Sequence, residues 1–84
     1  SGNEIEMVTW PNPTSDAVNM QLRNVIDESI LVRLLDRKGS ELGQKRFTPN
    51  EIIRFDLANV VPGVYFIEVI TSKGKRTEKI VVWR

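Results

Sequence analysis

The sequence predicts an all-β fold, an antiparallel β-sandwich of about seven short strands. Three observations support this fold class. Apolar and polar residues alternate with a period of two over much of the chain, which is typical of half-buried strands. Turn-forming residues separate these alternating runs. The 84 residues suffice for one small domain only, because domains usually span roughly 100–200 residues.

The N-terminal end holds the first, weakest strand candidate. Ser1 and Gly2 are typical of a cloning scar, so we assign residues 1–3 to a scar or linker and residues 4–84 to a single domain. Residues 5–9 are the weak strand candidate.

The second strand is predicted over residues 17–23. Val18, Met20 and Leu22 alternate there with polar residues, so one face of the strand would be buried and the other solvated. A helix is the alternative, because four apolar residues also fit helical spacing after an N-cap at Thr14 or Ser15. These residues are Val18, Leu22, Val25 and Ile26. The cleaner alternation and the β-rich remainder of the chain favour the strand.

The middle of the chain carries three more strand signals. Residues 30–35 are apolar on nearly both faces, which is typical of a central strand. Residues 42–47 are a weaker candidate. Ile53, Phe55 and Leu57 alternate with polar residues, so this segment is predicted to be a half-buried strand.

The last two strands have the strongest composition, and glycines mark the hairpin turns. Residues 64–70 and 80–83 are rich in β-branched and aromatic side chains. Gly39 and Gly74 stand where short hairpin loops need a positive φ. The predicted hairpins join 30–36 to 41–47 and 63–71 to 75–83.

Prolines mark two irregular segments. Pro11 and Pro13 force extended or turn conformation, because each fixes its own φ and restricts the preceding residue. Asn12 and Asp16 can hydrogen-bond the local backbone and make this turn rigid. The Pro-Gly pair at 62–63 comes directly before the strongest strand.

Composition excludes several classes of chemistry. The chain has no histidine and no cysteine, which removes the commonest general base, the Ser-His triad, disulfides and thiolate chemistry. Its net charge of +1 predicts no strong nucleic-acid-binding field. No apolar run approaches the roughly 20 residues of a membrane helix, so no membrane insertion is expected. A domain this small uses nearly all its apolar strand faces for the core, which favours a binding or targeting module over an enzyme.

No catalytic residue, cofactor or metal site is predicted. Ser72 and Lys73 are adjacent, but a solvated hairpin tip would not lower the pKa of the lysine. The acidic residues lack the spacing of a calcium-binding loop, and no glycine-rich phosphate loop is present. Some aromatic residues would suit a flat platform for sugars, although aromatic side chains more often fill the core. These residues are Trp10, Phe47, Tyr65 and Trp83.

Four sequence blocks in a fixed order resemble a known family. They are WPNPTSDAVN at 10–19, VRLLDRKG at 32–39, DLANVVPGVYFIEV at 56–69 and GKRTEKIVVWR at 74–84. Each block alone is weak, but their succession is similar to the type A C-terminal sorting domain of the type IX secretion system, also called the Por secretion system. Trp10 and Trp83 are bulkier than the residues common at these positions. The motif positions are Pro11, Asn12, Pro13, Asp16, Asp36, Gly39, Asp56, Leu57, Gly63 and Tyr65.

The resemblance implies an Ig-like β-sandwich that acts as an address label and not as a catalyst. Such a domain follows a larger cargo domain and guides it from the periplasm, through the outer-membrane translocon, to the cell surface or the medium. Its expected partners are the translocon and its shuttle proteins, and a surface sortase that removes the domain. A β-sandwich module for adhesion or carbohydrate binding is the alternative, and it would bind glycans through exposed Trp or Tyr side chains.

The basic end of the chain is the predicted recognition surface. Residues 1–28 hold five acidic residues against one basic residue, whereas residues 29–84 hold eleven basic residues against six acidic ones. Lys79 and Arg84, with Lys75 and Arg76, are the candidates for contact with an acidic receptor, because such charges contribute little to a core and accelerate encounter. The alternative is a solvated edge strand on which lysines prevent aggregation.

Overall fold

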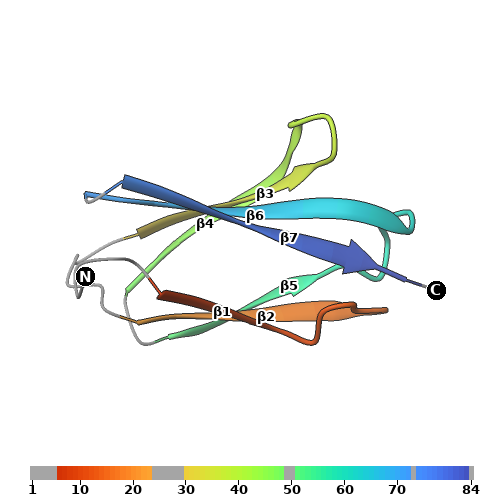
Figure 1. Cartoon of the computed structure of the whole chain (residues 1–84), viewed down its shortest axis with the longest axis horizontal. Coiled ribbons are helices and arrows are strands. Elements are labelled where there is room, and N and C mark those ends of the chain that lie inside the picture. The colour runs from red at the N-terminus through yellow and green to blue at the C-terminus, as the bar shows by residue number, and fades with distance from the viewer. Residues whose placement is uncertain (1–5, 24–29, 49–50, 73, 84) are drawn as a thin grey trace.

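The computed structural model describes residues 6–23, 30–48, 51–72 and 74–83, which form seven strands in two antiparallel sheets. The three-stranded sheet has the order β1-β2-β5, with β1 (Glu6–Trp10), β2 (Ala17–Arg23) and β5 (Ile52–Asp56). The four-stranded sheet has the order β4-β3-β6-β7, with β3 (Ile30–Asp36), β4 (Glu41–Phe47), β6 (Gly63–Thr71) and β7 (Gly74–Val82). The sheets face each other as a sandwich (Figure 1), which confirms the predicted fold class.

The described strands agree closely with the sequence periodicity. Ala17–Arg23 is a strand and not a helix, and both predicted hairpins, β3–β4 and β6–β7, are present. β5 ends at Asp56, one residue earlier than the alternation predicts. Its next residue, Leu57, donates its backbone N–H to Asp16 O at 2.7 Å in the turn before β2. The side chain of Leu57 nevertheless points inward and is fully buried, as the alternation requires.

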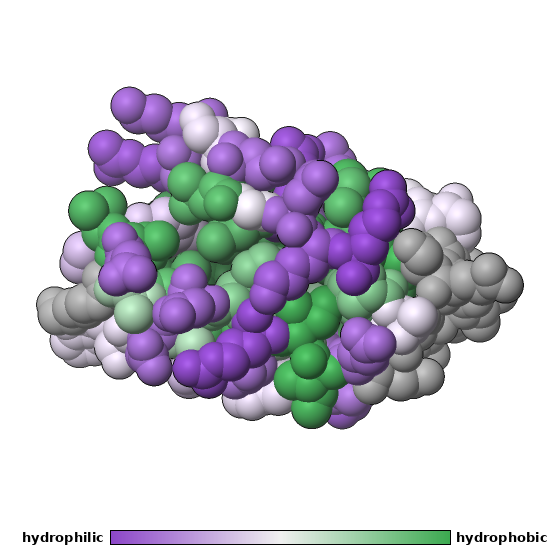
Figure 2. All heavy atoms as spheres, turned by 180° about the vertical axis from the view of Figure 1, so that it is seen from behind, coloured by the Kyte–Doolittle hydropathy of each residue, from purple (hydrophilic) through white to green (hydrophobic). Residues whose placement is uncertain are grey.

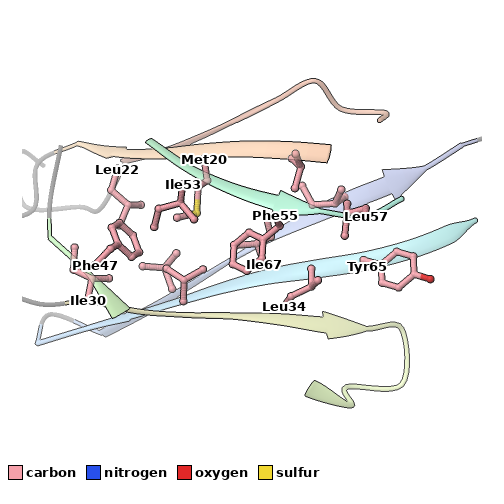
Figure 3. Close-up of a cluster of buried hydrophobic side chains, with 14 of the residues drawn as sticks. Met20, Leu22, Ile30, Leu34, Phe47, Ile53, Phe55, Leu57, Tyr65 and Ile67 are labelled. Atoms are coloured by element: carbon pink, nitrogen blue, oxygen red, sulfur yellow. The ribbon is translucent and has the colours of Figure 1, made fainter. Parts of the chain in front are cut away.

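One core fills the space between the sheets. Met20 and Leu22 from β2 and Ile53 and Phe55 from β5 face the inner side of the four-stranded sheet (Figure 3). Tyr65 and Leu57 lie at one end of this cluster. Burying large apolar side chains is the main stabilising term of so small a domain, at about 25 cal/mol per Å² of apolar area. Both sheets therefore depend on this core.

The antiparallel order places several turns at the same end of the molecule. The β1–β2, β3–β4 and β5–β6 connections and the C-terminal end of β7 all lie there (Figure 1). We call this end, residues 11–16, 36–40, 57–63 and 83, the turn end. The described part of the chain holds no helix of the length and apolarity needed to cross a membrane.

Candidate functional site

The motif positions gather at the turn end, although they come from three separate segments of the sequence. Asn12 and Asp16 lie in the β1–β2 connection, and Asp36 begins the β3–β4 turn. Leu57 and Gly63 begin and end the β5–β6 connection. The structure thus brings together in one region residues that are far apart in the sequence.

The proline segment clamps the two sheets together. Pro11 and Pro13 both follow cis peptide bonds and flank Asn12. The side-chain amide of Asn12 donates to Lys79 O at 2.9 Å, and its Oδ1 accepts from Val81 N at 3.1 Å. A residue of the β1–β2 connection thereby satisfies backbone groups on the outer edge of β7, in the other sheet.

Thr14 continues this clamp with its own backbone. Its N–H donates to Val81 O at 2.9 Å, and its carbonyl accepts from Trp83 N at 2.8 Å, so that Thr14 forms a parallel bridge with Val82. Thr14 is buried, and its hydroxyl donates to Ala17 O. The C-terminal half of the β7 edge is therefore covered, and its backbone groups are paired.

Two aspartates shape the other turns through their side-chain oxygens. Oδ1 of Asp36 accepts from the backbone N–H groups of Lys38 and Ser40, each at 2.9 Å. Gly39 lies between them with φ +86°, a conformation that disfavours residues with a Cβ. Oδ1 of Asp56 likewise accepts from Ala58 N at 2.9 Å. Asp36 and Asp56, two of the three motif aspartates, thus stabilise turns.

Tyr65 holds the β5–β6 connection in place. Its ring is buried in the core, and its hydroxyl donates to Val61 O, four residues earlier. A tyrosine that reaches back to the backbone of a preceding connection is typical of Ig-like sandwiches. Gly63, with φ +151°, allows the chain to enter β6 directly after this loop. The loop carrying Val61 is consequently held in a defined position.

The predicted recognition residues are distributed along β7 and do not form one cluster. Lys75 and Arg76 lie at the start of β7, at the end of the sandwich opposite the turn end, whereas Lys79 is closer to the turn end. Lys75 and Lys79 share the outer face, because the alternating Ile80 and Val82 point into the core. Arg84 lies outside the described residues.

Lys75 belongs to a charge network that the sequence analysis did not find. Arg33 Nε contacts Glu41 Oε1 at 2.7 Å, and Arg33 Nη1 contacts Glu68 Oε1 at 2.7 Å. Lys75 Nζ lies 3.6 Å from the other oxygen of Glu68. The hydrogen bonds that Arg33 donates to Glu41 and to Glu68 raise the pKa of Arg33 above its ordinary value, so Arg33 stays charged. The signal in the sequence was one charged residue within each of two apolar strand runs. The sequence does not show that the two residues meet; the β3–β6 register places Arg33 opposite Glu68.

The aromatic residues do not form the platform considered from the sequence. Phe47 and Tyr65 are buried in the core. Trp83 is 69% exposed and Trp10 is 37% exposed. Within the described ranges no group of three potential metal-ligating side chains occurs.

The sequence was also compared with known proteins. A family model described as "Secretion system C-terminal sorting domain" matches residues 8–83, which include all the motif positions. The search of curated proteins found none that matches.

Proposed function

The chain belongs to the family of secretion system C-terminal sorting domains, and we propose that it directs a cargo protein through the type IX outer-membrane translocon. This family is not an enzyme family. Membership implies a cargo N-terminal to the domain, contact with the type IX secretion machinery, and a secreted or surface location for the cargo. The observation that carries the proposal is the family match across 8–83, which covers both sheets and the whole described turn end.

The domain acts as a folded address label in this proposal. The Asn12 clamp, the Asp36 turn and the Tyr65 hydroxyl hold the turn end rigid before any partner arrives. Such preorganisation favours binding, because fewer groups lose conformational freedom when the complex forms. Shuttle proteins and the translocon read the domain in the periplasm, and the cargo then reaches the cell surface or the medium.

An extension of the C-terminus tests this role in a bacterium with a type IX system. A secreted reporter is fused ahead of the chain, and a short Gly-Ser extension is added after Arg84 in one version. A sorting signal should lose reporter export on extension, and deletion of all residues after Gly63 should abolish it. An adhesion or sugar-binding module would keep its function after the extension. Reporter export that continues unchanged in both the extended and the truncated version would reject the proposal.

The basic residues of β7 make charge contacts with an acidic receptor surface in this proposal. Lys79 is exposed and its side chain contributes little to the core. Replacing Lys79 and Arg84 with Ala should leave unfolding unchanged and reduce reporter export. Lys75→Ala with Arg76→Ala should also reduce export, at a small loss of stability because Lys75 Nζ lies 3.6 Å from Glu68.

Exposed arginines elsewhere provide the matched control for these charge changes. Arg23→Ala with Arg46→Ala removes two charges from β2 and β4 and should leave export intact. Equal export by the Lys79 and Arg84 variant and the wild type would reject the charge contact and leave the sorting role standing.

A surface sortase removes the domain in the last step that we propose. The exported cargo should then lack the mass of this chain, as measured by mass spectrometry of the surface and medium fractions. Cargo that retains residues 4–84 after export would reject the cleavage step alone.

A further inference from the structure

A groove of about 560 Å³ lies at the turn end, between the β3–β4 turn and the β5–β6 connection. Leu42, Val61 and Val64 contribute its apolar lining, and Arg37 and Lys38 contribute its cationic side chains. It is a different surface from the lysines of β7, none of which lines it.

Two apolar residues of the lining are exposed to solvent. Val61 is 74% and Leu42 is 48% exposed, although both side chains are large and apolar. At the turn end, on the left of Figure 2, hydrophobic surface lies next to projecting hydrophilic side chains. Apolar surface bordered by polar groups is typical of interaction sites. Val61 is also held in position, because Tyr65 donates its hydroxyl to Val61 O.

The cations of the groove are available to a partner. Within the described residues, neither Arg37 nor Lys38 forms a side-chain ion pair. The carboxylate of Asp36 lies in the same lining, but its Oδ1 already accepts from Lys38 N and Ser40 N. The lining therefore has two cations and one engaged carboxylate, which favours an anionic partner.

We propose that this groove binds a short extended peptide segment of a partner protein, with acidic side chains next to large apolar ones. The apolar side chains cover Leu42 and Val61, and the acidic ones contact Arg37 and Lys38. A small molecule fits less well, because its sites usually bury 70–90% or more of the ligand and these walls are open to solvent. That the partner is a component of the export machinery rests on the proposed function; the peptide chemistry of the groove does not.

Peptide titration of the isotopically labelled 84-residue chain, followed by NMR, tests the chemistry directly. The probes are three synthetic heptapeptides: acidic and apolar (DLDFELD), basic and apolar (KLKFKLK), and acidic without apolar residues (DSDSESD). We expect saturable shifts only with the first, confined to amides near Leu42 and Val61. No saturable shift with the first peptide, equal binding of the second, or shifts confined to another surface would overturn the proposal.

Variants of exposed residues separate the groove from the fold. Leu42→Ser with Val61→Ser should weaken binding of the first peptide by about tenfold or more, a factor that equals 1.4 kcal/mol. Arg37→Glu with Lys38→Glu should reverse the preference toward the basic peptide. Ile52→Ser is the matched control, because Ile52 is 59% exposed on β5, outside the groove lining. Equal loss in the control would contradict groove binding.

Reporter export distinguishes this proposal from the sorting role. If the wild-type chain exports the reporter, and export falls in the Leu42 and Val61 variant but not in the Ile52 variant, the groove is supported as a contact with the export machinery. Normal export by both variants overturns that contact and leaves the sorting role intact. No export by the wild-type chain overturns the sorting role, and the groove is then decided by the titration.

Discussion

Replacing Asn12 with Ala should destabilise the domain through the loss of one side chain that joins the two sheets. The amide of Asn12 makes two hydrogen bonds to the β7 backbone, at 2.9 Å to Lys79 O and at 3.1 Å to Val81 N. Asn12 is exposed, so the substitution creates no cavity and the effect comes from the hydrogen bonds. Both backbone groups become free to bond with water.

The expected magnitude follows from these two contacts. Each hydrogen bond contributes about 0.5–1.5 kcal/mol net, and solvent exposure places the pair at roughly 1–2 kcal/mol. A domain of this size loses about 4–8 °C of melting temperature per kcal/mol, so we expect a decrease of about 5–15 °C.

Urea unfolding measures this loss, and hydrogen exchange assigns it to the clamp. The Val81 amide should exchange faster in the variant, while Ile80 and Val82, which pair with β6, should keep their protection. Asn19→Ala is the matched control, because Asn19 donates one longer bond, 3.3 Å to Trp10 O, within one sheet. It should cost about 0.5 kcal/mol or less. Asn12→Ala with wild-type stability, or with a loss no larger than the control, would refute the clamp.

Three further substitutions test other parts of the structure by the same unfolding measurement. Leu57→Ala should lower the free energy of unfolding by about 2–5 kcal/mol because the side chain is fully buried, whereas the same substitution at the half-exposed Leu42 should lower it by about 0.5 kcal/mol or less. Similar losses at the two positions would contradict the core assignment. Asp36→Ala should cost about 1–2 kcal/mol through its two backbone hydrogen bonds, and Asp36→Asn should recover most of this because an acceptor oxygen remains; no recovery would contradict the turn role. Glu68→Gln should cost about 1–3 kcal/mol because its carboxylate is nearly buried between Arg33 and Lys75, whereas Lys75→Ala, with a 61% exposed side chain, should cost at most about 0.5 kcal/mol. A larger loss for Lys75→Ala than for Glu68→Gln would refute the network.

The strands and hairpin turns could be predicted because their signals are local. Alternation over 17–23 reports which side chains face the core, and the buried Val18, Met20 and Leu22 agree with it. Gly39 marks a positive φ because few other residues tolerate that conformation. Leu57 shows the limit of this signal, since alternation predicts the inward side chain but not the bond to Asp16 O that ends the strand.

The contacts of the turn end could not be predicted because they join residues distant in sequence. Asn12 and Lys79 are 67 residues apart, and no local pattern indicates that a proline turn covers the β7 edge. Sequence reasoning predicted that the side chains of Asn12 and Asp16 bond the local backbone. The Asn12 side chain instead bonds the distant β7 backbone, and Oδ2 of Asp16 lies 3.7 Å from Arg54 Nη2. The pairing of Arg33 with Glu68 likewise depends on the β3–β6 register.

The most direct test of the sorting role is the fraction of a reporter found outside the cell when this chain is fused after it. The measurement uses two otherwise identical strains, one with a functional type IX translocon and one without, and the same reporter lacking the chain as the control. We predict that the reporter leaves the cell only when both the chain and the translocon are present. Reporter that stays in the periplasm of the complete strain, or that leaves the strain without a translocon equally well, would contradict the account.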